Sequence, residues 1–341
     1  MTTTTDMHGY INATNFSDVW HNQSSAYDNA SDVSNSTLDH SYFQQPSRVA
    51  YYSLMTSIST AGIVGNSLVI YVIMTRQGMR TVSNLLLVNL AVADLIVLIT
   101  FLASSVVNLV RASTNLNSGS YFSVQYITIY IFYLSVYVSV YTLTLIAVVR
   151  YLVVAYPHKS KRFVARKPVG VILAVIWTGS FIFGTFKVSW FSIASPCYVR
   201  SVRFFTVFAY VLPLSVIATL SILTFRRLKQ PLGISGSEGQ NRNKKKAARL
   251  LVIIVVVFAV SWLPCHIYWI LWYALLCTGH YISLSSWNIA AMFAQCVALS
   301  NSCVNPIIYN LASAEFRQHF RDALCCRRQR RSATNRPIAL V

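Results

Sequence analysis

At 341 residues the chain is long enough for two soluble domains, but its composition is that of a membrane protein. Charged residues make up 11% of the chain, against about 25% in a soluble domain, and hydrophobic residues make up 55%. The net charge of +19 is spread over short segments between apolar runs, so no basic domain is available to grip nucleic acid.

The first 48 residues are polar and rich in Ser, Thr and Asn, which predicts a disordered segment. No apolar segment typical of a signal peptide precedes them, so we expect the first membrane helix to act as the targeting signal. Five N-x-[ST] sequons in so short a stretch predict glycosylation and an extracellular location, at Asn12, Asn15, Asn22, Asn29 and Asn35.

Seven apolar runs follow, each near or above the ~20 residues that a membrane-spanning helix needs. They predict an all-α membrane protein, a seven-transmembrane helix bundle. The third and sixth runs are longer than a bilayer requires, so we expect those helices to tilt or to extend into water. The runs cover residues 49–75, 82–110, 122–156, 169–186, 202–225, 247–276 and 283–311.

The distribution of Lys and Arg sets the orientation, because cytoplasmic loops carry an excess of both. With the N-terminus outside, the predicted inner segments hold 22 of the 28 Lys and Arg residues. The outer segments hold only Arg48, Arg111, Lys187, Arg200 and Arg203. This agrees with the sequons and predicts a multi-pass protein of the plasma membrane.

A short amphipathic helix is predicted after the seventh run, at 313–326, because Phe316, Phe320 and Leu324 recur at helical spacing. Such a helix lies on the inner leaflet, in contact with membrane lipids. Cys325 and Cys326 beside basic residues predict palmitoylation; the alternative is two unmodified thiols. The predicted organisation is an extracellular segment at 1–48, the bundle at 49–312, this helix, and a basic cytoplasmic tail at 327–341.

One acid lies deep in the predicted bundle. Asp94 comes twelve residues after Val82, hence ~18 Å from that end of its helix, and a charge at this depth indicates a functional site. Ser139, the cluster Asn301, Ser302 and Asn305 of the seventh helix, and Asn66 of the first are expected at similar depth. One carboxylate with hydroxyls and amides suits Na⁺, while a protonated Asp hydrogen-bonded in a packed core is the alternative.

Two stripes of side chains indicate a ligand pocket in the outer half. Phe132, Val136 and Ser139 share one face of the third helix, at spacings of four and three residues. In the sixth helix, Pro264 predicts a kink, and the stripe there consists of Trp262, His266, Trp269 and Tyr273. The alternative is that these aromatic side chains only pack or line the membrane interface.

These residues belong to motifs that occur in order along the chain: "GNSLVI", "NLAVADL", "VVRY", Trp177, Pro213, "FAVSWLP" and "NPIIY". From Val49 to Cys326 the chain therefore resembles the rhodopsin-like G-protein-coupled receptors. Within them it is most similar to galanin and allatostatin-A neuropeptide receptors, followed by the somatostatin and opioid-like groups.

The resemblance implies a mechanism. A ligand in the outer pocket biases the bundle, and the inner end of the sixth helix then moves outward to admit a heterotrimeric G protein, with arrestin as a further partner. The short third inner loop resembles that of receptors coupled to the inhibitory class. The sodium site of the family matches Asp94, Ser139, Asn301 and Asn305. Residues implied in activation and coupling are Arg150, Tyr151, Pro213, Phe258, Trp262, Pro264, Asn305, Pro306 and Tyr309.

Three positions depart from the family pattern. Gln125 replaces the cysteine that usually pairs with the second outer loop, so Cys197 of that loop is expected to be free, with Cys277 as an alternative partner. Val149 replaces the acid before Arg150, and Ser221 replaces a tyrosine of the fifth helix. A constitutively active or signalling-silent receptor is therefore an alternative.

The predicted pocket disfavours several ligands and functions. Phe132 stands where receptors for amines carry an acid, and no Lys for retinal lies in 290–311. An enzyme is not expected, because the histidines are scattered, nor is a transporter, because no repeat is visible. The pocket suits an extracellular peptide, with a lipid or other small ligand as the alternative; its expected lining is Phe132, Tyr133, Val136, Trp262, His266, Trp269, Tyr273 and Gln295.

Overall fold

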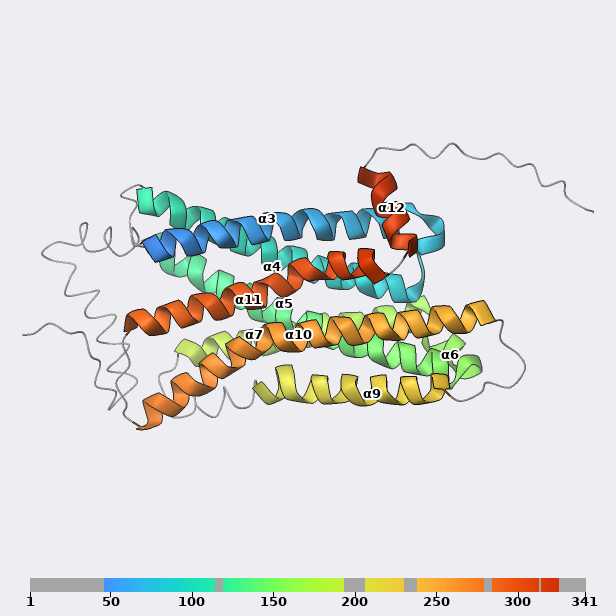
Figure 1. Ribbon diagram of the computed structural model, residues 1–341. Coiled ribbons are helices and arrows are strands. Elements are labelled where there is room, and N and C mark those ends of the chain that lie inside the picture. The colour runs from blue at the N-terminus through green and yellow to red at the C-terminus, as the bar shows by residue number, and fades with distance from the viewer. Residues whose placement is uncertain are drawn as a thin grey trace, which may run out of the picture.

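The computed structural model describes residues 46–113, 119–192, 206–229, 238–278, 284–312 and 314–324, and these form helices and short connections without a strand. Figure 1 shows the long helices running roughly along one axis. They are α3 (Pro46–Thr75), α4 (Val82–Ser113), α5 (Gly119–Ala155), α7 (Arg166–Ser192), α9 (Leu212–Lys229), α10 (Glu238–Thr278) and α11 (Leu284–Ala312).

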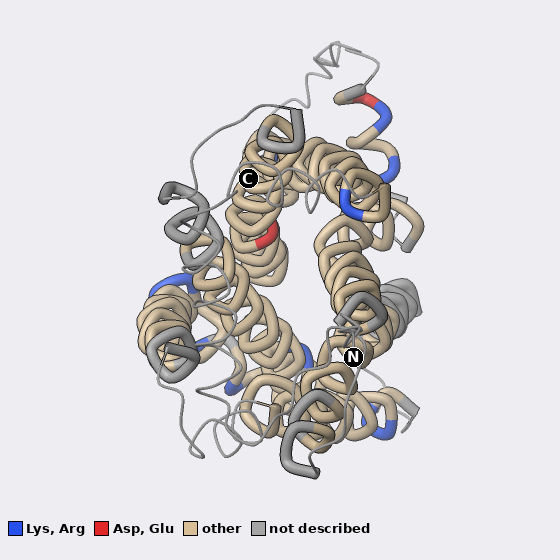
Figure 2. Tube along the Cα trace, turned by 90° about the vertical axis from the view of Figure 1, so that its left-hand side faces the viewer, with Lys and Arg blue, Asp and Glu red and all other residues tan. Residues whose placement is uncertain are grey.

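Seven helices in the described ranges are long and apolar enough to cross a membrane, which confirms the predicted fold class. Seen from the end where α3 begins, they form a ring in which residues other than Lys, Arg, Asp and Glu predominate (Figure 2). As expected, the third and sixth of these helices are the longest, with 37 residues in α5 and 41 in α10.

One short helix was not predicted. The third membrane helix, α5, ends at Ala155, one residue before the end of the predicted run, and α6 (Pro157–Phe163) follows after Tyr156. Pro157 explains this start, because proline suits the first turn of a helix, where no N–H donor is needed. Figure 1 places α6 at the same end of the bundle as the turn between α3 and α4.

Three helices meet at Asn89, a half-buried amide of α4. Its Nδ2 donates to Thr142 Oγ1 of α5 at 2.9 Å, and its Oδ1 accepts from Trp177 Nε1 of α7, also at 2.9 Å. Polar groups away from water need such partners, so this amide fixes the relative positions of α4, α5 and α7. Trp177, one of the motif residues, therefore has a structural role here.

The fifth membrane helix begins with a turn of π-helix, η2 (Val207–Val211), in which Leu212 N–H donates to Val207 O. The next bond of this kind would join residue 213 to Phe208 O, but Pro213 has no N–H to donate. Phe208 O accepts a hydrogen bond from the Tyr141 hydroxyl of α5 at 3.1 Å. This hydrogen bond joins α5 to the irregular turn.

Prolines also interrupt two other helices. Pro264 lies inside α10 and Pro306 inside α11. Each leaves a carbonyl of the preceding turn without its helical donor, which bends a helix. The predicted bend of α10 is visible in Figure 1.

The last described helix is α12 (Ala314–Leu324), which confirms the predicted amphipathic helix after the seventh membrane span. Phe316 and Phe320 are buried, and the Phe316 ring lies 5.8 Å from that of Tyr309. Arg317 donates to Asn310 O and Leu311 O, two carbonyls in the last turn of α11. This cap attaches α12 firmly to the end of α11.

Candidate functional site

The mid-membrane acid lies where the sequence predicts it, buried between α4 and α11 with 1% of its surface exposed. Asn305 Nδ2 donates to Asp94 Oδ2 at 2.9 Å, and Ser302 also hydrogen-bonds the carboxylate. Asn66 of α3 completes the group by donating to Ser302 O at 2.8 Å and to Gly62 O at 2.9 Å. The carboxylate is therefore held by a network that links α3, α4 and α11.

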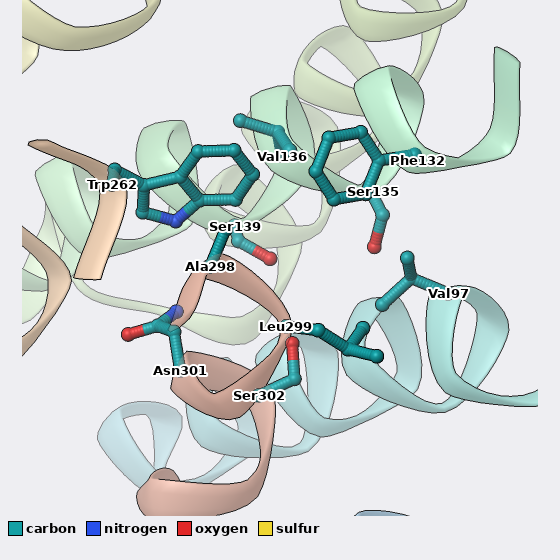
Figure 3. A pocket seen from close by; sticks show the side chains of 10 residues that line it. All are labelled: Val97, Phe132, Ser135, Val136, Ser139, Trp262, Ala298, Leu299, Asn301 and Ser302. Atoms are coloured by element: carbon teal, nitrogen blue, oxygen red, sulfur yellow. The ribbon is translucent and has the colours of Figure 1, made fainter. Parts of the chain in front are cut away.

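A small cavity adjoins this network. It leaves about 10 Å³ for the centre of a water molecule, close to the least that one water molecule needs. In Figure 3 the hydroxyl groups of Ser139 and Ser302 both point into it. The lining residues are Val97, Phe132, Ser135, Val136, Ser139, Trp262, Ala298, Leu299, Asn301 and Ser302.

The four residues predicted to hold sodium thus fall into two pairs. Asp94 and Asn305 contact each other directly, whereas Ser139 and Asn301 line the cavity. Ser302, which was not among the four, contacts the carboxylate and lines the cavity. Asn305 presents its N–H₂ group to Asp94, so in this arrangement it is a donor to the carboxylate and not an oxygen ligand.

Above the cavity, aromatic rings form a continuous path from α4 to α10. Phe101 contacts Phe132 at a centroid distance of 5.4 Å, and Phe132 contacts Trp262 at 5.3 Å. Trp262 in turn lies 6.1 Å from Phe258, which is 1% exposed. The indole N–H of Trp262 is buried without a hydrogen-bond partner in the described part of the chain. A change in the position of Phe132 would therefore be transmitted directly to α10.

The predicted pocket residues nearer the outer end have partners that the sequence did not indicate. The rings of His266 and Tyr210 pack at a tilt, with centroids 4.3 Å apart, and Tyr210 donates its hydroxyl proton to Ala259 O of α10 at 2.7 Å. Gln295 Oε1 accepts a hydrogen bond from the Tyr51 hydroxyl at 2.6 Å. These contacts make Tyr210 and Tyr51 candidate pocket residues that sequence reasoning missed.

Two further pocket residues belong to other clusters. Tyr133 packs against the buried Tyr137 and does not line the cavity. Trp269 contacts the edge of Tyr268, which stacks on Trp287 of α11 at 4.7 Å. The side chain of Tyr273 lies outside the described residues.

At the inner end, Arg150 is partly buried near the end of α5. Within the described ranges, no hydrogen bond or ion pair engages its guanidinium group. Val149 is 3% exposed and belongs to the main apolar core together with Val169. The residue in place of the family acid is therefore a packing residue.

Other predicted coupling residues are found nearby. Tyr151 contacts Tyr156 edge-on at 6.1 Å. The hydroxyl groups of Tyr309 and Ser221 are buried and lack a hydrogen-bond partner among the described residues. These two hydroxyl groups in the inner half of the bundle are thus available to form hydrogen bonds in another arrangement of the helices.

Several predictions fall on residues that are not described. They concern the side chains of Gln125 and Cys277, the whole of Cys197, and the modification sites, which are the five sequon asparagines and Cys325 and Cys326.

The ring of seven spans, with a polar network at its centre and aromatic side chains above it, defines the class as a seven-helix membrane receptor. A family model described as "7 transmembrane receptor (rhodopsin family)" matches residues 65–309, and the chain belongs to this family. The resemblance drawn from the motifs is therefore confirmed.

Curated relatives support the same assignment. The chain is 32% identical over 290 residues to an allatostatin-A receptor of Bombyx mori, covering 79% of this chain and 78% of the relative. It is 28% identical over 307 residues to galanin receptor 2b of Danio rerio, covering 84% and 78% respectively. Somatostatin receptor type 5 of Rattus norvegicus is 28% identical over 287 residues, 80% of this chain and 76% of the relative.

Proposed function

We propose that this receptor binds an extracellular neuropeptide of the allatostatin-A or galanin kind and activates a heterotrimeric G protein. The observation that carries the proposal is the outer layer above Trp262, where aromatic rings and neutral hydrogen-bonding groups predominate. Such a surface suits aromatic and amide groups of a peptide. The named relatives are receptors for peptides, which favours a peptide over a lipid or other small ligand.

The ring path offers a physical route from ligand to helix movement. A ligand that packs on Phe132 and Trp262 better in one arrangement of the bundle shifts the population toward that arrangement. Phe258 follows Trp262, and α10 bends at Pro264. Only the difference in affinity between the two arrangements drives this shift, so a ligand that binds both equally has no effect.

At the inner end, Arg150 and Tyr151 are the proposed contacts for the G protein, with inhibitory coupling and arrestin binding as further parts of the proposal. Tyr309, Pro306 and Asn305 on α11 and Pro213 on α9 are the proposed rearranging positions. The proposed location is the plasma membrane, with the glycosylated segment 1–48 outside and α12, palmitoylated Cys325 and Cys326, and the tail 327–341 inside.

The test of peptide binding is a screen of amidated and free neuropeptides on cells that express the full chain with a promiscuous G-protein reporter. A peptide agonist is expected, and Gln295→Ala should lower its potency by about tenfold, since one buried hydrogen bond to the ligand is lost. Tyr71→Phe, a change on a lipid-facing side chain of α3, is the control. Activation by lipid extracts alone would contradict the proposal.

A second candidate function rests on Val149. With an apolar residue before Arg150 and no described partner for its guanidinium group, the receptor would signal without ligand. Basal nucleotide exchange measured in membranes with and without the receptor decides this. Exchange equal to that of control membranes would exclude constitutive activity, and failure of every agonist to raise it would indicate a signalling-silent receptor.

A sodium ion is the proposed allosteric ligand of the polar network. Asp94 would supply the charge, and Ser139, Ser302 and Asn301 would supply neutral oxygen atoms from the cavity, which matches the oxygen ligands that hard cations prefer. Agonist affinity should then fall at least about fivefold as sodium rises, and Asp94→Asn should remove this dependence. Asp322→Asn on α12 is the matched control, and equal sodium sensitivity in both variants would refute the site.

A further inference from the structure

Arg150 carries a positive charge at the inner end of α5 without a described counter-ion. The residue is partly buried, and no hydrogen bond or ion pair engages its guanidinium group within the described ranges. A guanidinium group stays protonated in proteins and carries several N–H donors. A charge that is partly removed from water is costly unless an opposite charge and hydrogen-bond acceptors accompany it. Among the described residues, the arginine therefore lacks the partner that such a charge requires.

The acids that follow α3 lie away from this arginine. After position 75 the sequence contains only Asp94, Glu238, Glu315 and Asp322. Asp94 belongs to the mid-membrane network, and the last two belong to α12, which packs against α3 and α11. Glu238 begins α10, ~24 Å before Ile254 of the main apolar core. Arg150 is much closer to that core, one turn after Ile146.

Ser221 of α9 has a hydrogen-bond donor that is not used. The other hydroxyl side chains of this helix each donate to a carbonyl one turn back; they belong to Ser215, Thr219 and Thr224. The Ser221 hydroxyl, in contrast, is buried and has no partner among the described residues. Its proton is therefore available to an acceptor that the described helices do not provide.

Arg150 and Ser221 continue two helix faces that meet in the main apolar core. Arg150 lies one turn beyond Ile146 on α5, and Ile146 is buried in that core. Ser221 lies one turn beyond Ile217 on α9, which is buried in the same core. The two helices pack against each other. Donors without acceptors are thus found on two neighbouring helices toward the inner end of the bundle.

We propose that a chloride ion binds between the Arg150 guanidinium and the Ser221 hydroxyl, in place of the family acid that Val149 replaces. One negative charge balances one guanidinium group, and a spherical anion accepts hydrogen bonds from both donors without a fixed geometry. A phosphate brings more charge and more acceptor atoms than these two groups match. Val149 itself offers no acceptor, since its side chain is apolar and packed in the core.

An anion on Arg150 would compete with the G protein that is proposed to contact this residue. Basal signalling would then depend on the chloride concentration of the cell. Binding of the anion itself requires neither a ligand nor coupling, so it can be tested without either. The alternative is that cytoplasmic water alone hydrates the partly exposed guanidinium group. In that case the kind of anion in solution makes no difference.

The experiment measures thermal unfolding of the purified full-length receptor in detergent while sodium chloride replaces sodium gluconate. Total salt is held at about 0.15 M, so that ionic strength and the sodium available to the Asp94 network stay constant. The test variants are Ser221→Ala, which removes one donor, and Val149→Asp, which supplies a fixed carboxylate beside Arg150. The control is Arg227→Gln, a change of an exposed basic residue at the inner end of α9.

Chloride should raise the unfolding midpoint of the unmodified receptor by about 2–4 °C, as expected for an ion present at several times its dissociation constant. Ser221→Ala should weaken the apparent chloride affinity at least about fivefold, because a hydrogen bond to a charged group is lost. Val149→Asp should remove the chloride dependence, and Arg227→Gln should keep it.

Equal unfolding midpoints of the unmodified receptor in chloride and in gluconate would overturn the site. The same holds if Arg227→Gln loses the chloride effect as fully as Ser221→Ala. A chloride dependence that persists in Val149→Asp would contradict a position beside Arg150. If Val149→Asp does not fold, Arg150→Gln takes its place and should likewise remove the chloride dependence.

Discussion

The two sides of the helix bundle are held together differently. On the side of α3, α4 and α11, buried hydrogen bonds cross between helices at mid-membrane, through Asn66 and Asn305. On the side of α9 and α10, the fifth and sixth membrane helices meet through the tilted ring pair of Tyr210 and His266 and through the Tyr210 hydroxyl. Half of the α4 span is buried in the protein, against 28% of the α9 and α10 spans.

This difference separates a fixed part of the receptor from a movable one. Displacing α11 from α3 would leave buried amides and carbonyls without partners, which costs more than separating apolar rings in a lipid environment. Helices that take part in conformational change come from the weakly held part of a protein. We therefore expect α10, and not α11, to make the larger movement.

The largest effect is expected from a change on the fixed side. A Cβ on Gly62 would lie 2.6 Å from Cys303 Sγ and 2.7 Å from Leu98 Cδ1, closer than atoms can approach. Gly62→Ala should therefore lower the free energy of unfolding by about 1–3 kcal/mol, measured as thermal unfolding in detergent. The control is Gly179→Ala, where a Cβ meets nothing within 4 Å. A control that is as unstable as Gly62→Ala would show that packing on this side is not decisive.

A smaller effect, on signalling, is expected on the movable side. Tyr210→Phe keeps the ring that packs against His266 but removes the hydrogen bond to Ala259 O. The arrangement in which this hydrogen bond is formed would lose about 1 kcal/mol of stability. The population ratio would then shift roughly fivefold toward the arrangement in which the inner end of α10 has moved outward. Basal nucleotide exchange on the G protein should rise accordingly. Unchanged basal exchange would mean that this hydrogen bond is kept in both arrangements.

The smallest effect on signalling is expected from a change at the π-helical turn. Tyr141→Phe removes the hydrogen bond to Phe208 O and should lower the free energy of unfolding by about 0.5–1.5 kcal/mol. Because this contact joins α5 to the π-helical turn η2 and does not touch α10, basal exchange should stay the same. Thermal unfolding and basal exchange, measured on the same preparation, distinguish it from Tyr210→Phe.

The seven spans and α12 could be predicted because apolar length and helical spacing are local properties of the chain. Asp94 could be placed at mid-membrane for the same reason, since the rise per residue converts sequence distance into depth. Its partner Asn305 belongs to a helix far along the chain. In the sequence the two residues were related only by their similar expected depth in the membrane. The roles of Asn305 as donor and Ser302 as cavity residue needed the structure, because depth does not tell which way a side chain points.

Tyr210 was missed for a different reason. The π-helical turn inserts an extra residue, which rotates the start of the fifth membrane helix relative to a regular one, so helical spacing misplaces its faces. The contact between Arg166 and Arg80 joins the start of α7 to the turn between α3 and α4, 86 positions away, and no periodicity indicates it. In contrast, Pro157 was a usable signal for α6 that sequence analysis did not apply.

The position of Pro264 in α10 has a mechanical consequence. From Pro264 the helix extends about 39 Å to Glu238 on the inner side and about 21 Å to Thr278 on the outer side, at 1.5 Å per residue. The proline thus divides α10 into a longer inner segment and a shorter outer segment. A rotation of α10 by about 10° about Pro264 displaces the inner end by roughly 7 Å and the outer end by roughly 4 Å, given those lengths. A ligand therefore needs to draw the outer end inward only slightly to open a much wider space on the opposite side of the membrane.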